Sequence, residues 1–514
     1  MKLFAILLAA TMLVPAAGAD AAKPAKQSAV TDRQRDESSK IIAAFDFERL
    51  TEDDKYARLI LLHAERLTPD WVAVPERRDG LVVIRTLALM KLGRAKEGLD
   101  LATATIATGT AGTNVYGLAI LAAAEAEDPV VSLPLYEKAA ALLAEARAEL
   151  RAMLPKEVVD LLWRKLWDAK NVAGRQRFAE ALLTLGWPDE GEIAYRDFYR
   201  SQAIDGRIAR GDIEGARALA AQIVDPSTLG TLLVARKYDA LFPPDMDRAG
   251  LLQASLAGFD RATRERAEAM PEDAKRLLQR GNALRALGRE AEALSLFLPF
   301  ASDLKKVEAA GETGYWIVND AALTLGSAGR HDEALALMDA LLTLGVDKHT
   351  DLVSMAINYG EMLNVAGRFK EAAAYETKLA ESKLNASPYG FMWTWSIIAC
   401  AHALSGDAAA AAPWLDKLRA NSSDNQAAHM RGLLCANDLD SAEKLLVSRL
   451  RGDAPEDLLL KLQDYRLGTT RGVAAKILEP RLLALRERPA VRQAIGEVGR
   501  VMSLPLSKTY WGDY

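Results

Sequence analysis

The chain has 514 residues, a hydrophobic fraction of 50%, a charged fraction of 26% and a formal net charge of −5. These proportions exclude an intrinsically disordered protein, which carries few hydrophobic residues and a high net charge. A mildly acidic chain without a basic run also lacks the positive surface that binds nucleic acid, so we expect no nucleic-acid partner. Alanine, leucine, glutamate and arginine dominate the sequence and favour helices, which predicts an all-α fold.

Residues 1–19 have the pattern of a cleaved signal peptide. Lys2 gives a positive start, an apolar run extends from Leu3 to Val14, and Ala17-Gly-Ala19 supplies small residues for cleavage. The run is too short to span a bilayer, and no later segment reaches about 18 uninterrupted apolar residues. We therefore expect a mature chain without a transmembrane segment, located in the periplasm of a Gram-negative bacterium or secreted.

The rest of the chain divides by its periodicity. Residues 20–40 lack an apolar period and predict a flexible lead, whereas a helical period begins near Ile41. Prolines at 243 and 244 cannot continue a helix and predict an internal joint. We expect divergent helical repeats in residues 41–248, regular repeats in 249–451, and a helical cap and tail in 452–514. The tail residues Tyr510 and Trp511 are expected to dock into the cap or the groove, with the cap favoured.

A turn residue recurs along the chain and is followed, five residues later, by Gly or Ala in every copy. The turn residues are Gly93, Gly186, Gly211, Gly288, Gly329, Gly367, Gly406 and Asn437. Gly and Asn end a helix because they adopt the left-handed conformation, and a small residue lets the next helix approach closely. Nine residues after the turn, five copies carry a residue expected to lock the same face: Tyr195, Phe297, Met338, Leu415 and Leu446. The pattern predicts stacked αα-hairpins.

This layout resembles the tetratricopeptide repeat family, whose pattern is W-x2-L-G-x2-Y, then A-x3-F, then P. The matching positions are Gly281, Leu284, Ala293 and Phe297 in one copy, and Trp395, Ile398, Ala399, His402, Ala411 and Leu415 in another. The closing proline is largely missing, and the turns at 288, 329, 367 and 406 are spaced more widely than the family's roughly 34 residues. The resemblance implies an α-solenoid of antiparallel helix pairs, a TPR-like superhelix.

The resemblance also implies where a ligand binds, because the first helix of each repeat lines the concave face. The implied groove residues are Lys275, Asn282, Arg285, Trp316, Asn319, Ser354, Glu361, Asn364, Trp393, Ser396 and Arg431. Amide, cationic and indole groups suit a peptide backbone, a carboxylate or a sugar ring. Glu361 would repel a carboxylate unless it is paired. The alternative is that the polar residues are only solvated and the tryptophans fill gaps between helices.

Catalytic and metal-binding motifs are missing from the sequence, so we expect no enzyme, cofactor or metal. If neighbouring first helices run parallel with level turns, the Cα atoms of Cys400 and Cys435 lie beyond the ~7 Å that a disulfide allows. A disulfide is therefore not expected. A metal site formed by these cysteines with His402 and His429 is not expected either, because their helix faces diverge.

Together these features predict an exported scaffold or adaptor that holds a protein or peptide segment along its concave face. The alternative is a carbohydrate-binding or cell-wall-processing accessory subunit, with polysaccharide as the partner. The groove tryptophans favour this alternative, and the lack of any catalytic domain weighs against it.

Overall fold

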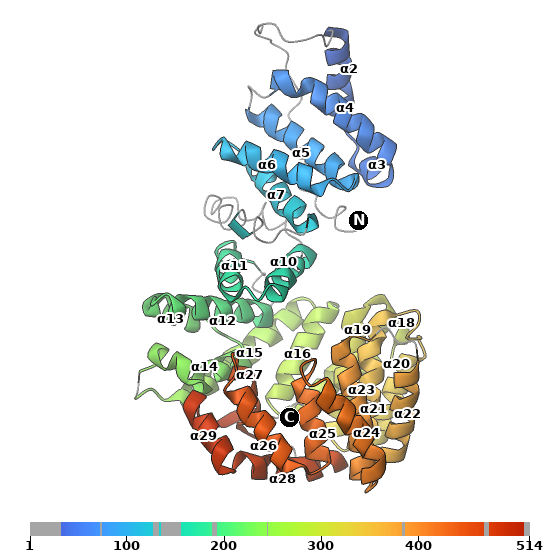
Figure 1. Ribbon diagram of the computed structural model, residues 1–514. Coiled ribbons are helices and arrows are strands. Elements are labelled where there is room, and N and C mark those ends of the chain that lie inside the picture. The colour runs from blue at the N-terminus through green and yellow to red at the C-terminus, as the bar shows by residue number, and fades with distance from the viewer. Residues whose placement is uncertain are drawn as a thin grey trace. The chain divides into compact units, whose positions relative to one another are not determined.

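The computed structural model describes residues 32–71, 75–126, 133–134, 156–187, 193–243, 245–382, 386–466 and 472–507. The predicted signal peptide, most of the lead and the tail residues Tyr510 and Trp511 lie outside these residues. Helices dominate the described chain, which divides into two compact units, residues 1–221 and residues 222–514 (Figure 1). The unit boundary at 221 precedes the predicted joint. Among the described helices, none is both long and apolar enough to cross a membrane.

The described helices of unit 1 are α2 (Asp32–Ala43), α3 (Phe47–Glu52), α4 (Asp54–Trp71), α5 (Pro75–Lys91), α6 (Ala95–Ala107), α7 (Thr113–Glu125), α10 (Lys156–Asp168), α11 (Val172–Thr184), α12 (Ile193–Ala209) and α13 (Ile213–Ala220). Each described helix from α3 onward packs against the next described helix, and α2 packs against α4. Helix α2 begins at Asp32, inside the predicted lead. Its sequence is too polar to show a clear apolar period, and it is held by tertiary contact, with buried Ser38 Oγ 3.0 Å from His63 Nδ1 on α4.

Unit 2 contains the regular repeats, each a first helix followed by a second helix. The first helices are α16 (Ala274–Ala286), α19 (Glu312–Ser327), α21 (Val353–Val365), α23 (Pro388–Leu404) and α25 (Gln426–Cys435). The second helices are α17 (Glu290–Ala301), α20 (His331–Leu342), α22 (Phe369–Glu381), α24 (Ala408–Ala420) and α26 (Leu439–Leu450). Each first helix contacts the first helix of the next repeat, and Figure 1 shows α19 to α24 stacked side by side. The predicted solenoid of helix pairs is confirmed.

The predicted turns have the expected backbone conformation. Gly288, Gly329, Gly367 and Gly406 all have φ between 72° and 88°, and Asn437 has φ of 57°. In the first of these turns, Gly288 N–H donates to the Arg285 carbonyl at 2.9 Å and Arg289 N–H donates to the Leu284 carbonyl at 2.8 Å. Such bonds satisfy the carbonyls that a helix leaves unpaired at its end. The small residues five positions later are buried wherever they are described, and Gly191 lies outside the described residues.

The residue nine positions after the turn differs in burial between the predicted copies. Phe297, Met338 and Leu446 are buried, Leu415 is half-buried, and Tyr195 is 43% exposed. The predicted lock is therefore wrong for Tyr195.

Unit 2 begins and ends with elements outside the repeats. Before them come α14 (Pro226–Val234), the 3₁₀ helix η1 (Arg236–Leu241) and α15 (Arg248–Ala269), and between α17 and α19 lies α18 (Leu304–Ala309). A short 3₁₀ helix, η2 (Thr350–Leu352), precedes α21. After the repeats come α27 (Glu456–Lys461), β1 (Asp464–Arg466), α28 (Val473–Arg486), α29 (Pro489–Val498) and β2 (Ser503–Ser507). The predicted helical cap thus also contains a parallel pair of strands, β1 and β2, far apart in sequence.

The C-terminal end of unit 2 contacts the N-terminal end of the same unit. The Arg500 guanidinium donates to both carboxylate oxygens of Asp239 at 2.6 Å and to the Leu233 carbonyl at 2.9 Å. A β-bridge joins Ala235 to Gly499. Helix α27 packs against α14 and α29 packs against η1 (Figure 1), so the cap closes the unit rather than only covering its last repeat.

Candidate binding surface

The predicted groove residues separate into two sets by their position on the first helices. Lys275, Trp316, Ser354 and Trp393 all stand thirteen residues before their turns, near the beginnings of α16, α19, α21 and α23. Lys275 and Ser354 are exposed, and the two tryptophans are half-buried. We call these four residues the row. They are the predicted residues at this register, and all of them remain accessible.

The predicted residues nearer the turns are mostly buried. Of the predicted residues nearer the turns, Asn282 is exposed. The others are buried: Arg285, Asn319, Glu361, Asn364, Ser396 and Arg431. A buried side chain cannot touch a partner without rearrangement of its surroundings. Their role as ligand contacts therefore stays a prediction.

One group of them connects three first helices by hydrogen bonds. Arg285 Nη1 lies 3.1 Å from Asn282 Oδ1 and 3.2 Å from Asp320 Oδ1. Asn319 donates to Asp320 Oδ1 at 3.1 Å and accepts from Asn358 Nδ2 at 2.9 Å. The amide and cationic groups predicted to hold a ligand thus join α16, α19 and α21. Asp320 and Asn358 were not predicted, although both are polar residues on first helices.

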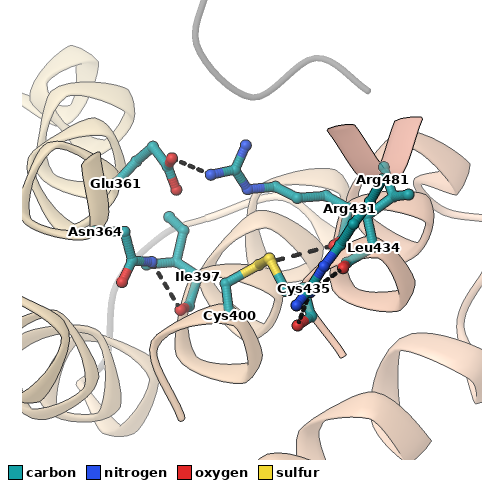
Figure 2. Close-up of a disulfide and its surroundings, with 8 residues drawn as sticks. All are labelled: Glu361, Asn364, Ile397, Cys400, Arg431, Leu434, Cys435 and Arg481. Atoms are coloured by element: carbon teal, nitrogen blue, oxygen red, sulfur yellow. Dashed lines mark hydrogen bonds and ion pairs between the residues drawn. A yellow bond between two sulfur atoms is a disulfide. The ribbon is translucent and has the colours of Figure 1, made fainter. Parts of the chain in front are cut away.

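A second group lies deeper, across α21, α23 and α25. Arg431, which is 2% exposed, forms an ion pair with Glu361, and Asn364 Nδ2 donates to the Ile397 carbonyl at 3.0 Å. Figure 2 shows both interactions on one side of the disulfide. Burial raises the pKa of Glu361, and the Arg431 guanidinium lowers it in part. The pairing that Glu361 needed is therefore supplied from within the chain, two repeats away.

Cys400 and Cys435 form a disulfide, so the sequence prediction was wrong. Their Cα atoms are 5.0 Å apart. The prediction used the distance between helix axes, roughly 8–10 Å, but facing Cα atoms each lie about 2.3 Å off their axis. Their separation also leaves no room for the axial offset of about 6 Å that level turns would give. Since both sulfurs are bonded to each other, neither is available as a thiolate ligand.

The cap covers the ends of these same helices. Helix α28 packs against α21, α25 and α26. Its Arg481 donates to the carbonyls of Leu434 and Cys435 at 2.7 and 2.8 Å, where α25 ends (Figure 2). A cation at this position satisfies the unpaired carbonyls and interacts favourably with the helix dipole. The inner face near the turns is thus occupied by the chain itself.

Aromatic side chains surround the beginning of α23. Tyr389, which is 55% exposed, meets Trp393 edge to face with ring centroids 6.5 Å apart. Trp395 packs against the small core that contains Met392 and Leu418. Tyr389 and the row residue Trp393 together leave apolar surface accessible at the beginning of α23.

Among the described residues, no group of three or more His, Cys, Asp and Glu side chains could hold a metal ion. Glu376 on α22 is 0% exposed and is one of the buried acids that the sequence analysis missed. The spacing could have predicted that Glu376 is buried. It stands nine residues after Gly367, and the four other copies in this unit carry Phe, Met or Leu at that position.

No protein-family model matches the chain, and no curated protein is similar to it. Among solved structures, Naa15/Naa10 bound to HypK-THB aligns with 15% identity and a TM-score of 0.24, over 81% of this chain and 68% of that chain. The APC/C hetero-tetramer Cut9-Hcn1 aligns with 12% identity and a TM-score of 0.22, over 90% and 96%. Similarities this low carry no argument, so the assignment rests on the helix pairs themselves. The described chain is an all-α solenoid of stacked helix pairs.

Proposed function

We propose that the chain is an exported, non-catalytic scaffold that binds a protein or peptide segment along the row. The observation that carries this proposal is the accessibility of Lys275, Trp316, Ser354 and Trp393 at one register of four consecutive first helices. Repetition of one register on stacked helices is how solenoids present an extended binding surface.

The dimensions suit an extended segment. Packed helices lie roughly 8–10 Å apart, and an extended chain rises about 3.3 Å per residue. A segment of roughly nine residues therefore spans the four helices of the row. The two tryptophans provide large apolar anchors with a polar N–H, the kind of side chain that contributes most to binding energy in protein interfaces. The Trp316 Nε1 already lies 3.4 Å from Glu312 Oε1, which holds this ring in place.

Export is the part of the proposal that rests on residues 1–19, together with the disulfide. Disulfides form and persist in the periplasm and outside the cell, and they are rare in the cytosol. The Cys400–Cys435 pair supports an oxidising location for the mature chain.

The test is site-specific crosslinking in periplasmic extract. A photoreactive amino acid is placed at Trp316 or Trp393, and, as a control, at Trp167, which is 59% exposed in unit 1. We expect both row positions to crosslink the same protein and the control position not to. We also expect the double variant Trp316→Ala, Trp393→Ala to recover less of that protein in a pull-down. Equal recovery by the double variant and by Trp167→Ala would contradict the proposal.

A second candidate function is binding to a polysaccharide, and the accessible pair Tyr389 and Trp393 favours it. Sugar rings stack on exposed aromatic faces, and these two rings lie next to each other at the beginning of α23. The candidate predicts that purified cell-wall polysaccharide retains the wild-type chain and not the Tyr389→Ala, Trp393→Ala variant. Retention of both chains would exclude this surface as the sugar site.

A further inference from the structure

Glu376 occupies a position that other repeats in unit 2 fill with an apolar side chain. Phe297 and Leu446 stand nine residues after their turns and are buried, and Glu376 stands at the same place after Gly367 with 0% exposure. Phe297 and Glu376 pack against equivalent glycines. Each side chain lies on the glycine seven residues before its own turn, Gly281 for Phe297 and Gly360 for Glu376, and a Cβ at that glycine would overlap it.

The surroundings of Glu376 supply no countercharge. Neither of its carboxyl oxygens has a hydrogen-bond partner among the described residues. Helix α22 packs against α21 and α23. The charged group that acts on Glu376 from α21 is Glu361, whose guanidinium partner is Arg431, and α23 contributes the uncharged Thr394.

A buried carboxyl group with no positive partner, whose charged form is favoured only by the uncharged Thr394 side chain, is far more stable as the neutral acid than as the carboxylate. Burial raises the pKa of Glu376 well above its usual value; the Thr394 side chain lowers it in part, and Glu361 raises it. The neighbouring phenol of Tyr375 on the same helix also has a raised pKa, chiefly from burial, so it carries no charge at neutral pH either.

We propose that Glu376 is a proton-dependent latch between α22 and the helices α21 and α23. As a neutral acid it packs like the apolar residues of the other repeats. When it loses its proton to solvent, the carboxylate cannot remain in this interior and α22 loosens. Ser354 and Trp393 stand on the two helices that α22 contacts, so loosening changes the spacing of these side chains. The latch does not depend on what binds the row.

The direction of the pH effect follows from the raised pKa. The folded chain holds this proton more tightly than the unfolded chain, in which the pKa of a glutamate is about 4.3. The stabilisation from Glu376 is therefore complete below that value and is lost progressively as the pH rises towards the folded-state pKa. Glu361 also has a raised pKa, so the contribution of Glu376 must be isolated by comparison with a variant.

The experiment is amide hydrogen exchange of the full chain between pH 5 and pH 9, corrected for the intrinsic exchange rates. In α22 of the wild type we expect protection factors to fall with pH, by up to about tenfold per pH unit, relative to Glu376→Gln. Glu376→Leu, which resembles Leu446 in its repeat, should remove the same pH dependence and decides the matter where the glutamine variant does not fold. Glu381→Gln, at the exposed end of the same helix, should behave as wild type.

Two results would overturn the latch. One is the same pH dependence of α22 protection in wild type, Glu376→Gln and Glu376→Leu. The other is loss of that dependence in Glu381→Gln, since the titrating group would then lie elsewhere.

Discussion

Two stretches of unit 2 use the same turns but have different interiors. In the repeats α16–α17 and α19–α20, the locking positions hold Phe297 and Met338, both fully buried in an apolar core. In the repeat α21–α22, the locking position holds Glu376, and the nearby Glu361 pairs with Arg431 across α23. Both stretches keep the left-handed glycine and the buried alanine five residues later.

The comparison teaches that the hairpin and its interior are specified separately. The turn needs only a residue that tolerates positive φ, and the close approach of two helices needs only a small side chain. The locking position needs a side chain of suitable volume over a glycine, which Phe297 and Glu376 both provide. Polarity at that position is therefore free to vary, at the cost of burying a group that water would otherwise solvate.

The largest expected effect comes from removing an apolar lock. Phe297→Ala should lower the free energy of unfolding by about 3–5 kcal/mol, because it loses a fully buried ring and leaves a cavity over Gly281. Urea unfolding followed by circular dichroism measures the change. The matched control is Tyr195→Ala, at the same register but 43% exposed, which should cost far less. Similar losses in the two variants would show that burial of this side chain does not determine the cost.

In the polar stretch, breaking the buried pair should cost nearly as much. Glu361→Leu leaves the Arg431 guanidinium buried without its carboxylate, and such a loss typically costs about 3–5 kcal/mol. The double variant Glu361→Leu, Arg431→Met replaces the pair by apolar groups and should recover most of that stability. A double variant as unstable as Glu361→Leu would mean that the pair itself, rather than the stranded charge, stabilises this stretch.

The two first helices that follow the repeat α21–α22 are joined covalently, by the disulfide between Cys400 on α23 and Cys435 on α25. Replacing Cys400 and Cys435 by Ala should cost about 2–4 kcal/mol, since the disulfide closes a loop with a sequence separation of 35. Unfolding of the oxidised wild type, the reduced wild type and the double variant gives the comparison. The reduced wild type should match the double variant, and coincidence of all three transitions would rule out a stabilising disulfide.

The smallest effects should come from the turns that both stretches share. Gly406→Ala has open space for its methyl group but a φ of 88°, so it should cost about 1–2 kcal/mol from the backbone alone. Gly367→Ala has a similar φ and also meets Val473 of α28 at 3.0 Å, so it should cost more. Thermal unfolding ranks the two variants, and the reverse order would argue against the contact with α28.

Much of the fold was predictable because its determinants are local in sequence. The turn residues, the described small residues and the locks Phe297 and Met338 were assigned correctly from their spacing. The assignment failed for Tyr195, which is 43% exposed. The paired strands of the cap were also missed, since two short segments separated by α28 and α29 carry no local sign that they pair.

Less of the candidate site was predictable. The row is accessible, but the burial of Arg285 and Asn364 depends on which neighbouring helices approach them. The pairing of Glu361 with Arg431 joins residues two repeats apart, a distance that spacing within one repeat cannot show. Their contribution to binding stays a prediction.

By itself the sequence determined that this protein is a helical-hairpin array, because helix propensity, left-handed turn residues and small contact residues act within one repeat. Only the tertiary structure decided how the hairpins share their inner face. It joined Cys400 to Cys435 and placed Arg500 of the cap against Asp239. It also left the row accessible while burying most of the predicted residues nearer the turns. These outcomes depend on helix spacing and on contacts between distant segments, neither of which is encoded by the period of a single repeat.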